Sequence, residues 1–233
     1  MFDVRDPVAG SRNVRDTGRF STCAYIPTGM NSLCTLTAPK GRPREFDLDV
    51  ALAGALRVFW RNGYEGASMA ELTAEMGITK PSLYAAFGNK EALFHKALDL
   101  YEREKLAYMT SALEAPTARA VAERLLRGAL QMQMSTCDPK GCLSVISSVA
   151  CSAEAEPIKA EVAKRRASSE AALMRRFDEA KAAGEFPDGL ESHALMRYLF
   201  AIMQGLSIQA GSGATCTELN QLVETSLSVW PTR

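Results

Sequence analysis

Residues 68–90 read SMAELTAEMGITKPSLYAAFGNK, and this stretch decides the fold. Ser68 can accept a hydrogen bond from the exposed N–H groups of a helix start, and a glutamate three positions later completes a capping box. Gly77 can adopt the left-handed conformation that ends a helix. Thr79 is a second capping residue, and Pro81 lacks the N–H that would be unpaired near a helix start. The pattern therefore predicts two short helices joined by a tight turn.

The second of these helices, predicted from Thr79 to Phe87, carries residue types that contact DNA on its outer side. A helix-turn-helix unit places its second helix in the major groove, where the first residues of that helix reach base edges. Lys80 and Ser82 are therefore candidate base readers. Side chains that suit phosphate contacts, which position a protein without reading sequence, are Ser68, Thr79, Tyr84 and Lys90. Two short helices around a glycine also occur in ordinary helical cores, so the turn alone leaves that alternative open.

The residues on both sides of the turn resemble the DNA-binding domain of the TetR family of transcriptional regulators. In that family the helix-turn-helix is followed by a Tyr, a Phe and a Lys at fixed offsets, which here are Tyr84, Phe87 and Lys90. An upstream helix with an apolar face, capped by Asp47 and closed by Gly63, also fits. The resemblance covers about residues 44–100.

This resemblance implies operator contacts at Lys80, Pro81, Ser82, Tyr84 and Lys90. Ala86 has no polar reach at a position where a larger reader can stand, so base specificity does not transfer from the family. The resemblance further implies a repressor that binds a palindromic double-stranded DNA operator as a homodimer. A ligand in the second domain would then move the two DNA-binding domains apart.

Because the chain as a whole has no net charge, any affinity for DNA must come from a local basic surface. The chain has 27 basic and 27 acidic residues in 233 and a pI near 6.7, so it is not a general nucleic-acid-coating protein. A basic run just before the first helix, formed by Lys40, Arg42 and Arg44, alternates with Gly41 and Pro43. Two interpretations are open for this run: an arm that reaches phosphates or the minor groove, and a solvated linker.

The cysteine, histidine and hydropathy patterns argue against several other classes. The 6 cysteines form no zinc spacing, and the 2 histidines, His95 and His193, are isolated, so no metal and no cofactor are expected. We expect no enzyme, because there is no nucleophile with a base and no Gly-rich phosphate loop. No apolar run reaches the ~18 residues of a membrane span, and no secretory signal is evident. A cytoplasmic location with free thiols and no membrane partner is therefore expected.

Three regions are predicted along the chain. Residues 1–39 follow no helix or strand period and are predicted to be a disordered leader; Met30 is an alternative start, because the family resemblance begins only near Arg44. Residues 40–88 are predicted to form the helix-turn-helix DNA-binding domain. Residues 89–233 are predicted to form a helical effector-binding and dimerisation domain.

Helical periods and caps predict six helices in the second region. They run over about 90–113, 117–135, 142–153, 156–183, 191–210 and 217–229. In the longest of them, the inward positions are predicted to be Ile158, Val162, Ser169, Leu173 and Phe177. The predicted fold class is all-α, with an N-terminal three-helix helix-turn-helix domain followed by a six-helix ligand-binding and dimerisation domain.

The last two helices are apolar over much of their circumference, which suggests burial against a second copy of the chain. We predict a four-helix bundle across a two-fold axis, as the family resemblance also implies. The predicted interface residues are Leu195, Leu199, Phe200, Met203, Leu206, Leu219, Leu222, Val223 and Leu227. The alternative is a well-buried helix in a monomer core.

The resemblance also implies an unknown small-molecule effector, for which a mostly apolar molecule is the default. Candidate lining residues are adaptable or bulky apolar side chains, namely Met109, Met132, Met134, Cys142, Met174, Phe177, Phe200 and Met203. Such residues at helical spacing are more often plain core.

A second hypothesis is a thiol-based repressor that senses redox state or electrophiles through Cys142. This residue lies at a predicted loop-to-helix boundary, and Lys140 nearby would favour a thiolate. The alternative is packing alone, because free cysteine is among the most buried residue types.

Overall fold

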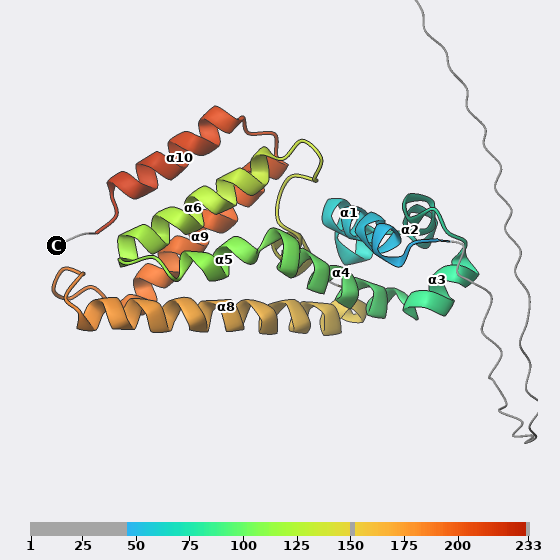
Figure 1. Ribbon diagram of the computed structural model, residues 1–233, viewed down its shortest axis with the longest axis horizontal. Coiled ribbons are helices and arrows are strands. Elements are labelled where there is room, and N and C mark those ends of the chain that lie inside the picture. The colour runs from blue at the N-terminus through green and yellow to red at the C-terminus, as the bar shows by residue number, and fades with distance from the viewer. Residues whose placement is uncertain (1–45, 150–151, 232–233) are drawn as a thin grey trace, which may run out of the picture. The chain divides into compact units, whose positions relative to one another are not determined.

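The computed structural model describes residues 46–149 and 152–231 of the chain (Figure 1). These ranges contain ten α-helices, one short 3-10 helix and no strand, which confirms the predicted all-α class. The helices are α1 (Leu48–Gly66), α2 (Met69–Met76), α3 (Lys80–Phe87), α4 (Lys90–Lys105), α5 (Ala107–Ala112), α6 (Ala118–Met134), α7 (Leu143–Val149), η1 (Ala153–Ala155), α8 (Glu156–Ala182), α9 (Ser192–Gly211) and α10 (Cys216–Ser228). The predicted leader and its alternative start at Met30 lie outside the described residues.

The helix-turn-helix forms through the local capping contacts that its sequence predicts. Ser68 Oγ accepts a hydrogen bond from the Glu71 N–H, while the Glu71 side chain accepts one from the Ser68 N–H, so the capping box that starts α2 is complete. Gly77 ends α2 with a φ of 66°, a backbone conformation that glycine adopts without steric cost. Thr79 then caps α3 by accepting from the Ser82 N–H at 3.3 Å.

The predicted helix from residue 90 to residue 113 is two helices, so the described chain has one α-helix more than predicted. The helical path breaks at Leu106, whose N–H bonds to the Tyr101 carbonyl five positions back. After the break, the Tyr108 ring packs directly over Gly128 of α6, where an added Cβ would lie 2.2 Å from Tyr108 Cδ2. The break lets α5 turn onto α6, a tertiary contact that helical periodicity does not reveal.

Two groups of buried side chains form the interior. One contains the core of the helix-turn-helix and continues through α4 into α7 and the first turns of α8, where Leu143, Ile158 and Val162 are buried. The other joins α6, the second half of α8, α9 and α10. The first group crosses the predicted domain boundary between residues 88 and 89, because α4 packs along α1. That boundary stays a prediction.

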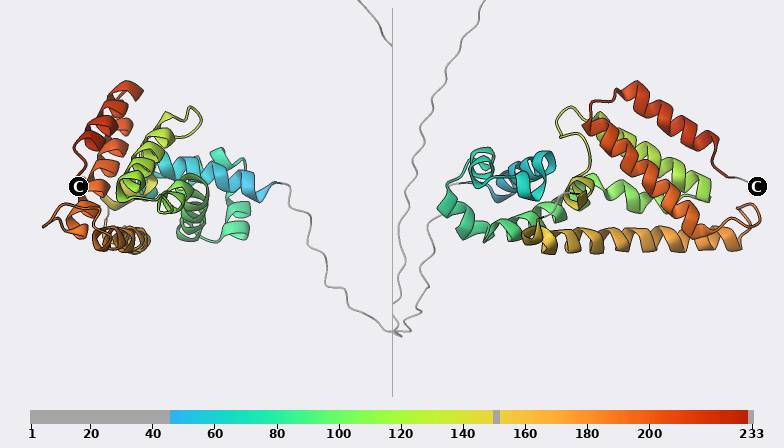
Figure 2. Two further views of the ribbon diagram at one scale, coloured as in Figure 1. Left: turned by 60° about the vertical axis from the view of Figure 1, so that its left-hand side comes forward. Right: turned by 180° about the vertical axis from the view of Figure 1, so that it is seen from behind.

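The apolar stripes of α9 and α10 face the chain's own interior. Helix α9 contacts α6, α8 and α10, and α10 packs against α6 (Figures 1 and 2). Seven of the nine predicted interface residues are buried within one copy of the chain: Leu195, Leu199, Met203, Leu206, Leu219, Val223 and Leu227. A side chain already shielded in the single chain has almost no area left to bury in a partner. Only Phe200 and Leu222 keep partial exposure.

Candidate DNA-binding surface and ligand cavity

The outer side of α3 presents one cation and one phenol to solvent. Lys80 is exposed at the first position of the helix, and 46% of Tyr84 is exposed one turn later. The Lys80 ammonium lies 6.0 Å from the Tyr84 ring centroid, at the outer limit of a cation–π contact. Both side chains are therefore available to a partner molecule.

The hydroxyl groups predicted to contact DNA already take part in helix caps. Ser68 Oγ donates to Glu71 at 2.8 Å in addition to its capping role. Ser82 Oγ lies 2.9 Å from Thr79 Oγ1, so these two hydroxyls share a hydrogen bond at the start of α3. Pro81 is exposed beside them. Each hydroxyl retains acceptor capacity, because an oxygen of this type offers two lone pairs.

Lys90 is half-buried at the start of α4. Its ammonium lies over the Tyr64 ring, 4.7 Å from the centroid. Burial lowers the pKa of Lys90, and the charge of Glu65 partly offsets this effect. Lys90 thus packs the start of α4 against the end of α1 and stays partly exposed. The predicted arm residues Lys40, Arg42 and Arg44 lie outside the described residues.

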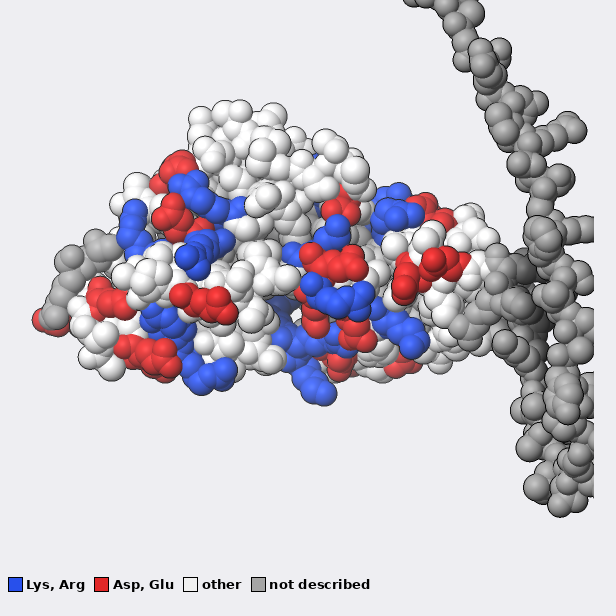
Figure 3. Space-filling view, in the orientation of Figure 1, with Lys and Arg blue, Asp and Glu red and all other residues white. Residues whose placement is uncertain are grey.

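Charges of both signs are interspersed over the face of the molecule shown in Figure 3. Few charged side chains appear around the N-terminal half of α10, at the top of that view. The exposed residues in this part of α10 are Cys216, Thr217, Glu218, Asn220 and Gln221, of which only Glu218 is charged. A surface with few charges suits contact with another protein better than contact with DNA.

A cavity of about 360 Å³ is bounded by residues from α4 to α9. Its apolar lining comprises Leu106, Met109, Ala129, Met132, Val145, Phe200 and Met203, and its other lining includes Glu102, Tyr108, Thr110, Cys142, Ser144, Arg165, Arg166, Ser168, Ser169, Gln204 and Ser207. Five of the eight predicted ligand residues therefore reach it: Met109, Met132, Cys142, Phe200 and Met203. The volume is at the small end of the ~300–1,000 Å³ of ligand sites.

The other three predicted ligand residues lie elsewhere. Met134 is half-exposed at the end of α6, and Met174 packs against the core that includes α9. Phe177 is fully buried against the rings of Phe186 and Trp230. Helical spacing shows that a side chain faces inward but does not distinguish the middle of a core from the wall of a cavity.

Helix α8 contributes polar residues to the lining of the cavity. These residues were not among the predicted ligand contacts. Between the buried residues Val162 and Leu173 the inner face of this helix carries Arg165, Arg166 and Ser169. Ser169 reaches the cavity but is exposed, where an inward position was expected. The interruption of the apolar stripe of α8 was the available signal for a polar wall.

The two arginines of this wall differ in their partners. Arg165 donates to Asp99 at 2.7 Å, Glu102 at 3.0 Å and Glu161 at 2.8 Å. Burial disfavours its charge, but these carboxylates prevail and raise the pKa of Arg165. Arg166 makes one long hydrogen bond, 3.5 Å, to the Ser144 carbonyl.

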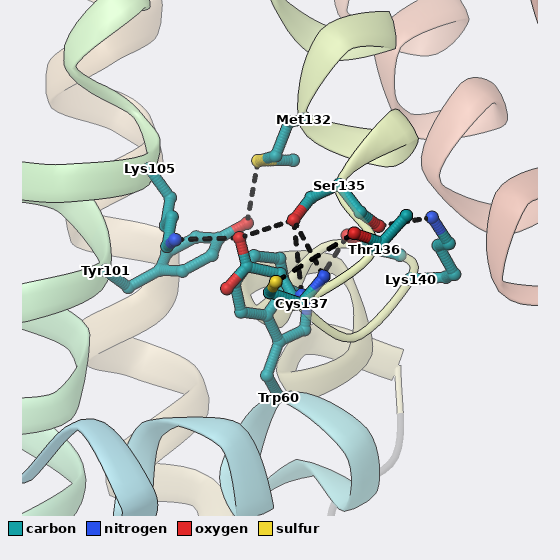
Figure 4. Close-up of polar contacts among 10 residues, drawn as sticks. Trp60, Tyr101, Lys105, Met132, Ser135, Thr136, Cys137 and Lys140 are labelled. Atoms are coloured by element: carbon teal, nitrogen blue, oxygen red, sulfur yellow. Dashed lines mark hydrogen bonds and ion pairs between the residues drawn. The ribbon is translucent and has the colours of Figure 1, made fainter. Parts of the chain in front are cut away.

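Tyr101 contacts Cys142, which lines the cavity. The Tyr101 hydroxyl donates to Cys142 Sγ at 3.4 Å. It also lies 3.7 Å from Met132 Sδ (Figure 4). Burial, followed by the proximity of Cys142, raises the pKa of Tyr101 well above its usual value. Cys142 directly precedes α7, as its predicted boundary position requires. Lys140 does not support a thiolate there, because its ammonium donates to the carbonyls of Gln133 and Ser135.

The loop between α6 and α7 joins the cavity to the helix-turn-helix. Trp60 of α1 donates from Nε1 to the Gly141 carbonyl at 3.1 Å, and Gln133 Nε2 donates to the same oxygen at 3.1 Å. The Gly141 N–H returns a 2.8 Å hydrogen bond to Gln133 Oε1. Lys105 of α4 anchors the loop further through Asp138 at 2.7 Å (Figure 4).

Within the described ranges, no group of three or more His, Cys, Asp or Glu residues is placed to hold a metal ion. None of the helices that the structure describes has the length and apolar character needed to cross a membrane. The surface feature that points to a function is the exposed pair of Lys80 and Tyr84 on α3, the second helix of the helix-turn-helix. Together with the fold, they define a helix-turn-helix DNA-binding protein.

Comparisons with known proteins agree with this class. Residues 51–97 match the family model described as "Bacterial regulatory proteins, tetR family". The HTH-type transcriptional repressor ComR of Escherichia coli (strain K12) is 33% identical over 194 residues, which cover 82% of this chain and 92% of that protein. The HTH-type transcriptional regulator YezE of Bacillus subtilis (strain 168) is 32% identical over 202 residues, covering 81% of this chain and 98% of that protein.

A solved structure gives the same result. It contains a cysteine mutant of the TetR family transcriptional regulator CifR complexed with 26-bp double-strand operator DNA. This structure is 38% identical to the chain, covers 82% of it and 100% of its own length, and superposes with a TM-score of 0.76. The chain belongs to the TetR family of transcriptional regulators.

Proposed function

We propose that this regulator is a cytoplasmic repressor that binds a palindromic operator as a homodimer and leaves it when a small molecule enters the cavity. The observation that carries the DNA-binding part is the exposure of Lys80 and Tyr84 on α3. Lys80 stands at the start of the helix, where side chains reach base edges. ComR, which is a repressor, and CifR, which was solved with operator DNA, support this proposal by similarity.

A homodimer would use the outer stripe of α9 in place of the buried stripe. Tyr198, Ala201, Gly205 and Ile208 recur every three or four positions, and 55% of Ile208 is exposed. An added Cβ at Gly205 would meet no atom of the chain within 4 Å, so this position is open to a partner. Pairing through α9 and α10 would space two recognition helices by about one duplex turn, ~34 Å.

Release by a ligand requires a path from the cavity to α3. Cys142 and Met132 line the cavity and touch Tyr101, and the loop that ends at Cys142 is bonded to Trp60 of α1 through Gly141. Displacement of this loop would move α1 and, through α2 and α4, the recognition helix α3 that packs against them. The ligand would need a higher affinity for the DNA-free arrangement than for the DNA-bound one.

A gel shift on the DNA upstream of the gene tests the DNA-binding part. We expect specific binding by the unmodified chain and a loss of about 10-fold or more in Lys80→Ala and in Tyr84→Ala, since one contact to a base or phosphate contributes ~1–3 kcal/mol. Lys96→Ala removes an exposed cation of α4 and serves as the matched control. Unchanged binding in both α3 variants, or an equal loss in the control, would contradict the proposal.

One observation keeps thiol sensing as a second candidate: Cys142 lines the cavity and accepts a hydrogen bond from Tyr101. An activated alkene that enters the cavity would add this sulfur to one carbon of its double bond while the thiol proton ends on the other carbon, and the adduct would displace the Tyr101 hydroxyl. We expect Cys142→Ser to abolish release of operator DNA by N-ethylmaleimide, while Cys137→Ser, which alters an exposed cysteine, leaves release intact. Persistent release in Cys142→Ser would rule out this candidate.

A further inference from the structure

We propose that the effector is a small organic monocarboxylate whose carboxylate binds Arg166 and whose apolar body fills the remainder of the cavity. This inference rests on the proposed function and changes the expected chemistry of the ligand, for which a mostly apolar molecule was the default. It depends on three features of the cavity: the interrupted stripe of α8, the ion pairs of its two arginines, and the apolar residues of the lining.

The interruption in α8 places charge where core packing would require apolar side chains. The inner face of α8 is buried at Ile158 and Val162 and again at Leu173 and Phe177. The turns between them contribute Arg165, Arg166 and Ser169 to the cavity instead. Two guanidinium groups on the inner side of a helix carry a desolvation cost that an anionic partner offsets.

Of the two arginines of the wall, only Arg166 lacks an ion-pair partner among the described residues. The charged lining residues are Glu102, Arg165 and Arg166. Arg165 already forms ion pairs with Glu102, Asp99 and Glu161, at distances of 2.7 to 3.0 Å. Among the described residues no carboxylate forms an ion pair with Arg166. A ligand with one negative charge can supply the ion pair that Arg166 lacks, whereas the second charge of a phosphate dianion would add repulsion from the neighbouring carboxylates.

The donors of Arg166 are mostly unused within the described part of the chain. Its guanidinium carries five N–H groups, and one of them makes the 3.5 Å contact to the Ser144 carbonyl. This planar fork fits a carboxylate through two parallel hydrogen bonds. Gln204 and Ser207 of α9 add polar groups to the same cavity.

The apolar residues of the lining limit the rest of the ligand. Met109, Met132, Phe200 and Met203 offer flexible and aromatic apolar surface. A volume of about 360 Å³ suits a short alkyl chain or a single ring beside the carboxylate. Ser168 and Ser169 are exposed while lining the cavity, so this side opens toward solvent and gives a polar molecule a route of entry.

Paired acids and amides test the inference on the full chain. Octanoate and octanamide, and benzoate and benzamide, differ within each pair by the carboxylate alone. Isothermal titration calorimetry at neutral pH should show about 10-fold or tighter binding of the acid in at least one pair, since hydrogen bonds between charged groups contribute that much. In Arg166→Gln this preference should disappear. Arg166→Lys keeps the charge without the fork and should retain part of the preference.

Arg175→Gln is the matched control, because Arg175 is exposed on the same helix and outside the cavity lining. It should keep the full preference for the acid. Three results would each overturn the inference: no acid binds, acid and amide bind equally, or Arg166→Gln retains the preference. A gel shift on the same preparations keeps the two proposals separate, because operator binding without acid binding refutes the carboxylate alone.

Discussion

The indole nitrogen of Trp60 donates a 3.1 Å hydrogen bond to the carbonyl oxygen of Gly141, although 81 positions separate the two residues. Trp60 belongs to α1, the helix that precedes the helix-turn-helix, and Gly141 immediately precedes the cavity residue Cys142. The Trp60 ring also packs edge-on against Tyr101, with centroids 4.7 Å apart. One buried side chain thus connects the DNA-binding helices with the wall of the ligand cavity.

Replacement of Trp60 by Phe should therefore loosen the loop between α6 and α7. We expect Trp60→Phe to lower the free energy of unfolding by about 1 kcal/mol more than Trp230→Phe, because only the first variant loses a buried hydrogen bond. Trp230 is the matched control: it is equally buried, and its Nε1 has no hydrogen-bond partner among the described residues. Urea denaturation measures the difference. Equal losses in the two variants would show that the Trp60 hydrogen bond adds no stability.

Gln133 should be required for the conformation of the same loop. Its side chain binds both the N–H and the carbonyl of Gly141, so Gln133→Leu leaves a buried N–H without a partner. Such a group costs ~1–3 kcal/mol, and we expect that loss in urea denaturation. Faster hydrogen exchange at the Gly141 amide should accompany it. Gln131→Leu, at an exposed position of α6, should change stability by less than about 0.5 kcal/mol. A comparable loss there would contradict the explanation.

The stability of the helix-turn-helix should depend on pH through Glu75. This carboxylate accepts hydrogen bonds from Arg57 at 2.9 Å and Arg61 at 3.1 Å, which lower its pKa below the usual 4.5. Because the folded-state pKa is the lower one, the contribution is complete above pH ~4.5 and is lost as the pH falls through the folded-state value. The pair is partly exposed, so the contribution stays below about 1 kcal/mol.

Glu75→Gln should accordingly be less stable than the unmodified chain at pH 6, with the two becoming equal in acid. Urea denaturation across this range tests the dependence. Glu114 is an exposed carboxyl just after the end of α5, so the stability of Glu114→Gln should equal that of the unmodified chain at every pH. A difference between Glu75→Gln and the unmodified chain that does not shrink in acid would refute the assignment.

The oligomeric state should depend on Ile208. A charge at the centre of an apolar contact is costly to desolvate, so Ile208→Glu should convert a dimer to a monomer in light scattering after size exclusion. The fold should survive, since Ile208 is exposed in the single chain. Val50→Glu changes a residue that is 68% exposed on α1 and should leave the dimer intact. A dimer that persists in Ile208→Glu would place the interface elsewhere.

The caps and the turn of the helix-turn-helix could be predicted from sequence, because they depend on groups within four positions of one another. Asp47, Thr79, Asn89 and Thr117 each accept a hydrogen bond from a backbone N–H at the start of the following helix, as their types predict. The exposure of Lys80 and Tyr84 follows from the same periodicity. Both partners of each such contact lie within the same short stretch of sequence, so the contact can be expected without knowledge of the packing.

The cavity could be predicted only in part. Periodicity identified inward-facing residues such as Met132 and Phe200, yet it grouped them with Phe177, which is core. The break at Leu106 was missed because the contact that accompanies it, the Tyr108 ring over Gly128, joins two helices. The same limit explains the dimer residues. The apolar stripes of α9 and α10 indicated burial, but the partner that buries them is the chain itself.

The sequence by itself therefore determined the helix-turn-helix, its capping residues and the all-α class, since hydrogen bonds and apolar periods along single helices specify them. Only the tertiary structure decided which apolar stripe is core, where Arg166 faces a cavity, and how Trp60 meets Gly141. These features depend on helices distant in the chain packing side by side. Which helices cover a stripe, and whether a charge finds a partner, are properties of that packing, so the pattern of a single helix does not specify them.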